Sequence, residues 1–523
     1  MRPTSPKRGR DRGIVFACLF LTGAATLALE VVVSRVLTPY VGGGLTVWTA
    51  ILSVTLLALA AGYHVGSRWS LGDARRRFVV VPAVAAFLLA VAAATVPILL
   101  PRLTGMGALA GAFLGAILIL APPLVLLSSM GPLAVALIRG DRGDGGAGEA
   151  FAVSTVGSVL GVHLAAFVLL PLMPPTAALA ALAAGLAAVS SFAALGLRAP
   201  RALALSLVVV LAAAAVARPV GPEEIVQGEL RFTRVATERG PGSTVIVADL
   251  SRAGFPGRVR VYLEGNHLQS AMATHIPGAP LRYVAISNAL IAATTPPGGR
   301  VLVLGLAGGA GASALARAGY AVHAVDVNPE APKIARRWFD LAPGVAVTVA
   351  DARRFATRCE VKNEAARYDV VLIDVFSGVE IPDHLVTREF FEAVAACLTE
   401  GGAIVANTVI PPLRARPARR LLAALAEALE APVAVYPAAA EGAGRGNRIL
   451  FARQSAAAAP VLDLPDYPQS LFERSRRVLP PRVVTRAELA EVAPLTDWSN
   501  DFSLSLALTT PVPRGAAVPV HWR

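Results

Sequence analysis

Three aspartates in the second half of the chain stand where carboxylates can bind a nucleoside. Each of Asp326, Asp351 and Asp374 ends an apolar stretch of β-type composition. The carboxyl ends of neighbouring parallel strands form one edge of a sheet, and ligands of such sheets bind there. One acid can accept hydrogen bonds from ribose hydroxyls and another from an adenine amino group. A single strand-end aspartate is commonly a helix cap, whereas three in succession favour a nucleoside site. NAD binding would account only for the first.

The stretch before these acids, residues 301–319, supplies the loop that such a site needs. It passes from an apolar run through a glycine-rich loop into an alanine-rich helical segment. The loop contains Gly305, Gly308, Gly309 and Gly311. A buried strand, a tight glycine turn and a helix N-terminus make up the first unit of nucleoside-binding folds. The spacing is not a clean GxGxxG, so the loop is significant mainly because the three acids follow it.

The elements around the site indicate an α/β domain with a smaller β domain before it. Alternating polar and apolar residues predict β-hairpins over residues 223–297. Strand and helix patterns then alternate over 298–453, which predicts a Rossmann-like parallel sheet with helices on both faces. Residues 454–523 begin with an alanine-rich linker, and we expect an irregular tail after it.

Residues 1–218 have the composition of a membrane domain. Seven apolar stretches are close to the roughly 17–25 residues that cross a bilayer. They are residues 14–37, 45–66, 78–100, 106–128, 151–171, 176–197 and 202–217. Arginines gather in alternate loops, on the side of the basic N-terminus, and the positive-inside rule makes that side cytoplasmic. We therefore expect a multi-pass protein of the cell membrane.

The side of the membrane that holds the second half stays open. Seven spans with a cytoplasmic N-terminus would place it outside the cell, whereas a cytosolic nucleoside would require it inside. Either the short stretch 202–217 lies in the interface, or the count is off, or the domain is extracytoplasmic.

Ionisable residues inside the apolar stretches are functional candidates by default. Glu30, Arg35, His64 and His163 are the ones that stand out. The alternative is that Glu30 pairs with a neighbouring helix and that Arg35 extends its charge to the interface. The glycines at 157 and 161 predict a close contact between helices.

Charge and cysteine content exclude other classes of protein. The net charge is +13, but many arginines lie in membrane loops and no basic stripe is interleaved with aromatics, so no nucleic-acid partner is expected. Cys18, Cys359 and Cys397 form no CxxC and have no histidine cluster nearby. We therefore expect buried, inert thiols, without a disulfide framework or a metal site.

The second half resembles the S-adenosylmethionine-dependent transferases, specifically the membrane-fused members of the spermidine synthase-like (polyamine aminopropyltransferase) branch. The resemblance runs from about residue 243 to 409, with a further patch near 495–501. Its motifs are LEGNHLQS, LGLAGG, VDVNPE, DARRF and YDVVLIDVFSG. It implies a methyltransferase-type Rossmann fold and these cofactor-binding residues: Gln269, Gly305, Gly308, Asp326, Asp351 and Ala352.

The same resemblance implies that Asp374 is the catalytic residue. Asp374 would orient an amine and take up its proton, with Tyr283 and Ser377 also binding the substrate. The amine would displace methylthioadenosine from decarboxylated S-adenosylmethionine. His384 and Glu389 lie near the expected cleft, although Glu389 also fits a helix first-turn acid.

The chain departs from the family's pattern where the amine would bind. The glycine loop lacks the usual acid, Ser377 replaces a second acid, and Val284-Ala285 follow Tyr283 where the family has His-Glu. Lost acids remove the charge pairing that offsets desolvation of a polyamine. Three hypotheses therefore stay open: an aminopropyltransferase, a methyltransferase that uses S-adenosylmethionine itself, and a membrane transporter or sensor that only binds a nucleoside or polyamine. The resemblance also implies a homodimer and no metal.

Overall fold

The computed structural model of this chain divides it into two units, residues 1–221 and 222–522. It describes residues 6–41, 45–71, 73–103, 108–138, 145–197, 224–227, 229–239, 244–252, 257–264, 267–274, 281–359, 367–376, 381–438, 446–454, 459–462, 464 and 480–509. Two of the residues and segments singled out by the sequence, Ser377 and the stretch 202–217, lie outside the described residues.

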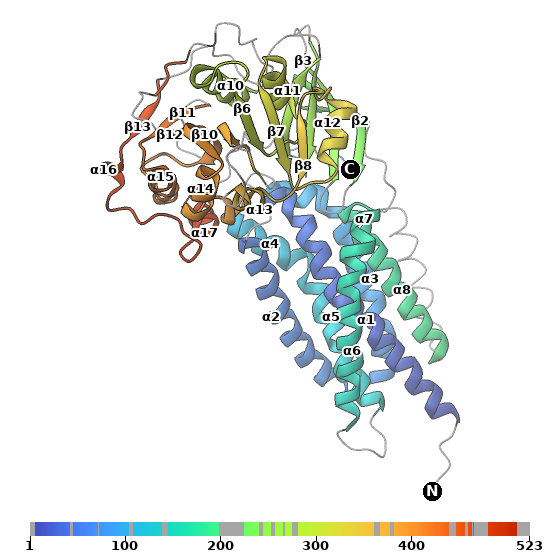
Figure 1. Ribbon diagram of the computed structural model, residues 1–523. Coiled ribbons are helices and arrows are strands. Elements are labelled where there is room, and N and C mark those ends of the chain that lie inside the picture. Colours follow the sequence, from blue (N-terminus) through green and yellow to red (C-terminus); the bar gives the residue numbers. More distant parts are fainter. Residues whose placement is uncertain are drawn as a thin grey trace. The chain divides into compact units, whose positions relative to one another are not determined.

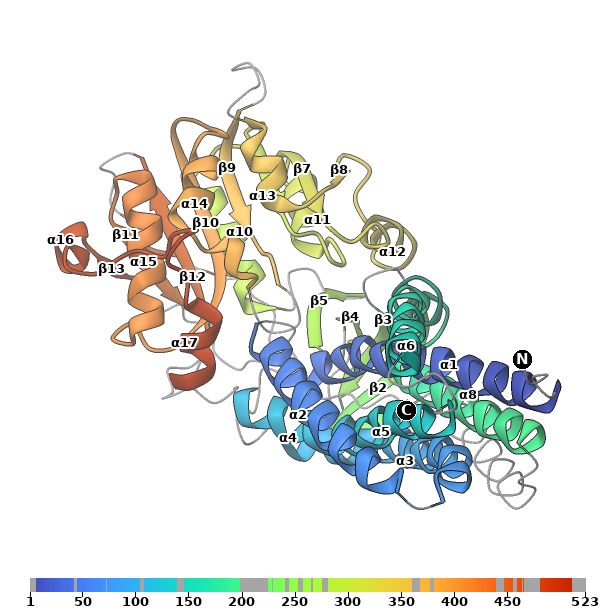
Figure 2. The ribbon, with the colours of Figure 1, turned by 90° about the horizontal axis from the view of Figure 1, so that it is seen from below.

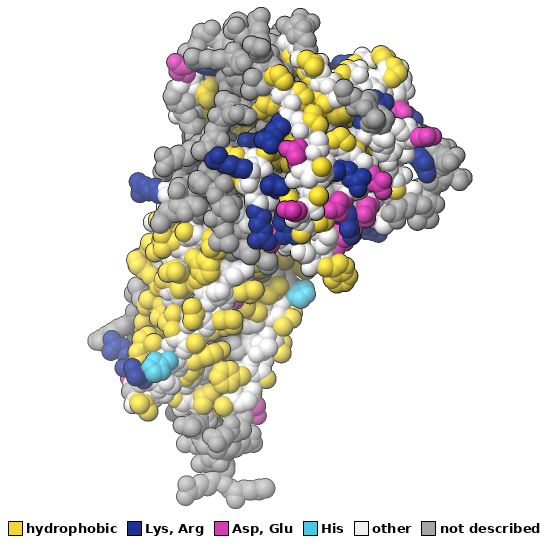
Figure 3. Space-filling view, turned by 90° about the vertical axis from the view of Figure 1, so that its left-hand side faces the viewer, with side chains coloured by type: hydrophobic (Ala, Val, Ile, Leu, Met, Phe, Trp, Pro, Cys, Tyr) yellow, Lys and Arg dark blue, Asp and Glu magenta, His cyan; other side chains and the backbone are white. Residues whose placement is uncertain are grey.

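The first unit is a bundle of apolar helices (Figures 1 and 2). Its helices are α1 (Pro6–Val41), α2 (Leu45–Trp69), α3 (Ala74–Leu103), α4 (Ala108–Ile119), α5 (Ala121–Ile138), α6 (Gly145–Leu164), α7 (Leu170–Leu172) and α8 (Pro175–Gly196). A short π-helical turn, Ala165–Leu169, joins α6 to α7. In the described part of the chain, six segments are long and apolar enough to cross a membrane. Hydrophobic side chains cover the face of the bundle seen in Figure 3.

The expected span 106–128 is divided in the structure. α4 ends at Ile119 and α5 begins at Ala121, so the apolar run contributes to two helices. Pro122 and Pro123 lie in the first turn of α5. Proline has no N–H and cannot continue the bonding ladder of a preceding helix, but it is tolerated at a helix start. A hydropathy window cannot register this boundary, because proline interrupts backbone bonding without making the segment polar.

Small residues bring α1 and α6 into close contact. A Cβ atom on Gly157 would lie 2.1 Å from the Phe20 carbonyl oxygen, and one on Gly161 would lie 2.0 Å from that of Ala24. From the other side, a Cβ on Gly23 would lie 2.3 Å from the Ser154 oxygen. The expected close helix contact at 157 and 161 is confirmed, and its partner is α1.

The second unit begins with an antiparallel five-stranded sheet. Its strands are β1 (Glu224–Gln227), β2 (Leu230–Arg239), β3 (Thr244–Arg252), β4 (Val259–Glu264) and β5 (His267–Ala273), in sequence order. One face packs against the larger domain through Tyr262 and Phe339, whose ring centroids are 6.0 Å apart. The small sheet is thereby anchored to the α/β domain.

An eight-stranded mixed sheet forms the centre of the second unit. Its strands, in spatial order, are β13 (Arg482–Val484), β11 (Val433–Pro437), β12 (Gly446–Arg453), β10 (Leu398–Ile410), β9 (Tyr368–Ile373), β6 (Arg300–Leu304), β7 (Ala321–Asp326) and β8 (Ala346–Val349). The five strands from β8 to β10 are parallel. The chain order reverses between β6 and β9, which is the place where such sheets bind ligands.

Helices cover both faces of this sheet. Alternate side chains of β6 point to opposite faces, as strand geometry requires. Val301 and Val303 pack with α10 (Arg282–Thr294), α11 (Ala310–Arg317) and α12 (Ala331–Trp338). Leu302 and Leu304 pack with α13 (Ala352–Thr357), α14 (Arg388–Ala395) and α15 (Arg416–Leu429). The expected fold class, an apolar helical domain followed by a methyltransferase-type Rossmann-like domain with a small β domain, is confirmed.

Three details of this domain differ from the expectations. The end of the stretch 223–297, expected to form β-hairpins, forms α10, which packs on the larger sheet. β12 runs antiparallel to its neighbours β10 and β11. β11 ends at Pro437 and β12 begins at Gly446, and this connection is shorter than the dozen residues a parallel crossover needs. The tail expected to be irregular contains β13, α16 (Arg486–Leu489) and α17 (Phe502–Thr509). It is held to α15 by the buried Arg420, which forms an ion pair with Asp501.

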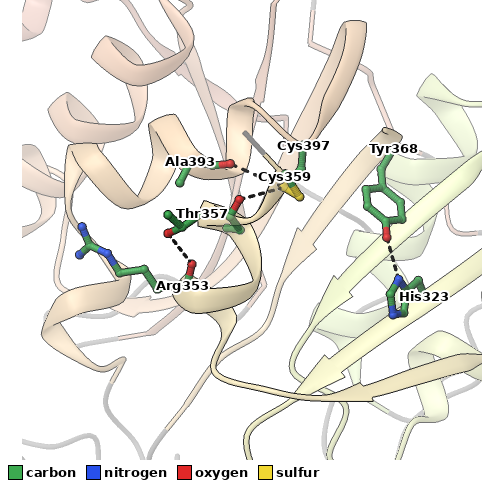
Figure 4. The surroundings of a disulfide bond; sticks show 8 residues. His323, Arg353, Thr357, Cys359, Tyr368, Ala393 and Cys397 are labelled. Carbon is green, nitrogen blue, oxygen red and sulfur yellow. Dashed lines mark hydrogen bonds between the residues drawn. A yellow bond between two sulfur atoms is a disulfide. The ribbon is translucent and has the colours of Figure 1, made fainter. Parts of the chain in front are cut away.

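The expectation of three inert thiols is wrong for two of them. Cys359, after α13, and Cys397, after α14, form a disulfide with Cα atoms 5.1 Å apart (Figure 4). The pair is 38 residues apart in sequence, and packing α13 beside α14 brings it together. Sequence spacing does not reveal such a pair, because the fold and not the local chain sets the distance. Cys18 is a free, buried cysteine.

We expect the purified chain to contain one free thiol and one disulfide. Alkylation of the unfolded chain should modify one cysteine before reduction and three after it, as counted by mass spectrometry. Replacing Cys359 and Cys397 with serine should lower the stability of the second unit by about 4 kcal/mol, from the chain entropy of a 38-residue loop. Cys18→Ser is the matched control, and three free thiols in the unreduced chain would contradict the pairing. Because disulfides persist mainly in oxidising compartments, the state of this pair in cells would also report the side of the membrane.

Candidate functional site

The glycine loop between β6 and α11 crosses directly over the end of β9. Gly305 has φ +98°, and a Cβ there would lie 2.0 Å from the Asp374 carbonyl oxygen. Gly309 has φ +70° and caps the N-terminus of α11. A side chain at Gly305 would meet both a steric clash and an unfavourable backbone conformation. The loop and Asp374 are therefore fixed against one another by main-chain contact.

Asp326, at the end of β7, holds the glycine loop in place. One carboxylate oxygen accepts hydrogen bonds from the N–H groups of Leu306 and Ala307, at 2.8 and 3.1 Å. The other accepts a bond from the N–H of Asn328 at 2.8 Å. By lone-pair count, the oxygen bonded to Asn328 can accept one further hydrogen bond. The acid expected to meet a ribose thus also shapes the loop beside it.

Asp351, at the end of β8, caps the following helix. Its side chain accepts a hydrogen bond from the N–H of Arg354 at 2.9 Å, and its other oxygen lies 3.2 Å from the His384 ring. Burial alone would raise the pKa of Asp351, but the Arg354 N–H and the His384 ring outweigh it and lower that pKa. Asp351 is therefore an ionised acid at the ligand edge of the sheet, and the capping role weighed from the sequence is present.

Asp374, after β9, is held by an amide on the neighbouring strand. Asn407 of β10 donates a hydrogen bond to its Oδ1 at 2.8 Å, and Asn447 of β12 donates to the Asn407 side-chain oxygen at 3.1 Å. Asn407 is 3% exposed, so its amide is fixed by these two partners. The result is a line of three polar side chains across three strands, ending at the carboxyl group.

Tyr283, at the start of α10, lies beside the Asp374 carboxyl. Its hydroxyl donates a hydrogen bond to the main-chain oxygen of Gln269 on β5, at 3.2 Å. A Cβ on Gly308 would lie 2.9 Å from the hydroxyl oxygen of Ser270, the next residue of β5. The small sheet therefore supplies one wall of the site, against the glycine loop and Asp374.

The surroundings raise the pKa of Asp374 to about 6. Burial is the largest cause, because it disfavours the charged carboxylate. The hydrogen bond from Asn407 and the adjacent Tyr283 hydroxyl oppose the shift, and the negative charge of Asp326 adds to it. Burial, followed by the nearby Asp374 charge, likewise raises the pKa of Tyr283 above its ordinary range. A carboxyl group of this kind can exchange a proton near neutral pH.

Comparison with known proteins gives relatives for part of the chain. A polyamine aminopropyltransferase from Vibrio vulnificus is 39% identical over 113 residues, which are 21% of this chain and 37% of that protein. The chain thus spans little more than a third of that relative's length.

This part of the chain is similar to the polyamine aminopropyltransferases. The resemblance inferred from the sequence motifs is thereby confirmed. A second relative, an N-terminal histidine N-methyltransferase from Emericella nidulans, is 34% identical over 110 residues, 21% of this chain and 20% of that protein. No protein-family model matches the chain.

Solved structures resemble the second unit more distantly. A probable spermidine synthase from Corynebacterium glutamicum has a TM-score of 0.41 and 22% identity, over 50% of this chain and 96% of that one. The spermidine synthase from Thermotoga maritima has a TM-score of 0.33 and 13% identity, over 53% and 90%.

The second unit brings most of the predicted residues to one edge of its eight-stranded sheet. Gln269, Tyr283, Gly305, Gly308, Asp326 and Asp374 surround the end of β6. Asp351 and Ala352 follow β8, the neighbour of β7, where the N–H of Ala350 bonds to the carbonyl oxygen of Asp326. Glu389 is in the first turn of α14 and accepts a bond from the N–H of Asp497 at 3.0 Å, so it fastens the C-terminal segment. The described residues contain no group of three His, Cys, Asp or Glu side chains able to hold a metal.

Sequence reasoning missed Asn407 and Asn447. Asn407 lies within GAIVANTV, an otherwise apolar stretch, and a lone amide in a buried strand needs hydrogen-bond partners. That was the available signal. The identity of its partner was not available, because the pairing of β10 with β9 and β12 decides which side chains meet.

Gly305→Ala should loosen the glycine loop. The change introduces a strained φ and a clash with the Asp374 carbonyl oxygen, at a cost of at least about 1–3 kcal/mol. Hydrogen exchange of the peptides that span β6 and α11 should be faster than in the unaltered chain. Gly344→Ala is the matched control, since nothing lies within 4 Å of a Cβ at that position. Equal exchange in both variants would contradict the close contact described here.

Proposed function

We propose that the second unit transfers an aminopropyl group from decarboxylated S-adenosylmethionine to an amine. The observation that carries the proposal is Asp374, a carboxyl group with a pKa of about 6 beside the glycine loop at the switch point of the sheet. A general base works best when its pKa lies near the operating pH. The similarity to a polyamine aminopropyltransferase supports the same class of reaction.

The proposed reaction is a direct displacement at carbon. The amine nitrogen forms a bond to the aminopropyl carbon that is attached to the sulfonium sulfur, while the bond between that carbon and the sulfur breaks. The electron pair of the broken bond stays on sulfur, and methylthioadenosine leaves. The proton lost by the attacking nitrogen passes to Asp374, with Tyr283 and Ser377 helping to position the amine. Alignment in a water-poor cleft would supply most of the acceleration.

The proposed co-substrate site follows the carboxyl edge of the sheet. Asp326 keeps one lone pair free for a ribose hydroxyl, and Asp351 with Ala352 would face the adenine. Gly305 and Gly308 let the loop beside the proposed ligand pack closely against Asp374 and Ser270, since a Cβ at either position would clash with those residues. Gln269 reaches the site from β5. These residues use hydrogen bonds and shape, and no metal is needed for this chemistry.

Methyl transfer is the second candidate. The Emericella nidulans relative is named as an N-methyltransferase, and the acids that would pair with a diamine are replaced in this chain. In that case S-adenosylmethionine itself would be the co-substrate and S-adenosylhomocysteine the product. The same carboxyl could accept the proton of a methylated amine, so identifying the product is what separates the two candidates.

The proposed organisation is a catalytic unit attached to a membrane domain. We assign residues 1–218 to the membrane domain, 223–297 to the β domain, 298–453 to the transferase domain and 454–523 to the linker and tail. Six described segments have the length and apolarity to cross a bilayer, which supports a multi-pass membrane location. The N-terminus would be cytoplasmic, and a homodimer is the proposed assembly.

Asp374→Asn should abolish turnover while leaving the binding of the co-substrate within about twofold. Loss of a general base costs roughly 10²–10⁴ in rate. The measurement is release of methylthioadenosine from decarboxylated S-adenosylmethionine by the full-length chain in detergent, with a panel of amines.

Asp340→Asn is the matched control, because Asp340 is exposed and pairs with Arg317. Turnover by Asp374→Asn equal to the control would rule out the assigned base. Release of S-adenosylhomocysteine in place of methylthioadenosine would establish the methyltransferase.

Asn407→Ala should move the acidic limb of kcat/KM to higher pH. Asp374 acts as a base only when ionised, so activity should rise with pH through about 6 in the unaltered chain. The Asn407 hydrogen bond favours the ionised form, and its loss raises the pKa of Asp374 further. Asn447→Ala should shift the limb less, in the same direction, because it acts through Asn407. A lower rate with an unmoved limb would mean that Asn407 only stabilises the fold.

A further inference from the structure

A stripe of polar side chains runs along α1 through the apolar bundle. Its members recur at every fourth position: Thr22, Thr26, Glu30, Ser34 and Thr38. Residues four apart lie on the same face of a helix, so these side chains follow one another along the helix surface. Thr22, Glu30 and Ser34 are buried, with 2%, 8% and 6% of their surface exposed. These three side chains lie inside the bundle, and Thr26 and Thr38 are half-buried.

The hydroxyl groups of this stripe present acceptors. Each hydroxyl hydrogen is donated to a main-chain oxygen of α1 itself: Thr22 to Cys18 at 2.8 Å, Thr26 to Thr22 at 2.9 Å, Ser34 to Val31 at 2.7 Å and Thr38 to Ser34 at 2.7 Å. What remains of each hydroxyl is its pair of oxygen lone pairs. A ligand that meets the stripe must therefore bring its own donors.

The centre of the stripe has unsatisfied hydrogen-bonding capacity. Glu30 Oε1 is a buried atom without a hydrogen-bond partner among the described residues. Thr55, on α2, is 3% exposed, and its hydroxyl is a hydrogen-bond donor and acceptor beside the Glu30 carboxyl. Within the described ranges no Lys, Arg or His nitrogen forms an ion pair with Glu30. A carboxyl group without an ion pair or a full set of hydrogen-bond partners is costly inside a bilayer, and such groups usually bind a ligand or an ion.

We propose that Glu30 and Thr55 form a binding site for the ammonium group of an aliphatic amine. An ammonium has a positive charge and three N–H donors, so one group can satisfy the carboxylate, the Thr55 oxygen and a neighbouring hydroxyl of the stripe. An anion would meet the negative charge of the carboxylate and the acceptor oxygens of the stripe. The first unit would then bind an amine, which is the chemical class of molecule that the second unit is proposed to use. The inference stands apart from the transferase assignment, since every group in it lies in the first unit.

The test measures amine binding to a chain in which the Asp374 carboxyl group of the second unit has been removed. The full-length Asp374→Asn chain is placed in lipid nanodiscs, and binding of radiolabelled 1,4-diaminobutane is followed by equilibrium dialysis. We expect saturable binding that weakens about tenfold or more on adding Glu30→Gln, because charged hydrogen bonds are being removed. Thr55→Val should weaken it about two- to tenfold. Glu149→Gln is the matched control, because that carboxyl lies near the start of α6 and pairs with Arg12. Absence of saturable binding, or equal binding with Glu30→Gln, would overturn the proposal.

Competition and chemical labelling distinguish the ammonium from other cations. Butylamine should displace the probe, whereas sodium or potassium chloride at the same ionic strength should not; equal displacement by the salts would make this an alkali-cation site and overturn the proposal. Dicyclohexylcarbodiimide, which modifies carboxyl groups in apolar surroundings, should label Glu30 in the unmutated chain, and 1,4-diaminobutane should protect it. Labelling that changes with pH but not with amine would mean a proton-binding carboxyl only. This second measurement does not depend on whether the Glu30→Gln chain folds.

Discussion

Main-chain contact between the glycine loop and the end of β9 is the constraint on which the site depends. The Asp374 N–H donates to the Leu304 carbonyl oxygen at 2.7 Å, and Gly305 leaves no space for a side chain beside the Asp374 carbonyl. This contact places a carboxyl group at the switch point of the sheet, where a ligand that lies along the loop must pass it. Asp326 then holds the same loop from the other side, through the N–H groups of Leu306 and Ala307. Asp326, Asp374 and the glycine loop therefore hold one another in place.

The parts of this arrangement that are local in the chain could be predicted from the sequence. The apolar runs, the glycines after β6 and the aspartates at strand ends are each set within a few residues, by periodicity, turn chemistry and capping. The same holds for the close packing at Gly157 and Gly161, since small residues one helical turn apart are a local pattern. Of the bonds that these acids form, only the local ones could be foreseen: Asp351 with the Arg354 N–H three residues away, and Asp326 with the Asn328 N–H two residues away.

The parts that could not be predicted depend on which strands become neighbours. Asn407 meets Asp374 because β10 lies beside β9, and Asn447 meets Asn407 because β12 turns back antiparallel. The disulfide depends on α13 packing against α14, which brings together two cysteines that are 38 residues apart along the chain. The division between α4 and α5 was missed for a different reason. Proline acts on backbone hydrogen bonding, whereas hydropathy measures only side-chain polarity.

Two carboxyl groups of this protein, Asp374 and Glu30, show how loss of solvation leads to different chemistry. Asp374 loses solvation but receives a hydrogen bond from Asn407, whose own amide is fixed by Asn447. The compensation is partial, and a carboxyl whose two protonation states are close in free energy at neutral pH is suited to exchanging a proton. Glu30 also loses solvation, and its Oε1 receives no hydrogen bond from the described residues. A group with a permanent internal donor can act on a substrate's proton, whereas one without a donor needs the ligand itself as its partner. The number of donors that the protein supplies, more than the depth of burial, separates the roles proposed for these two acids.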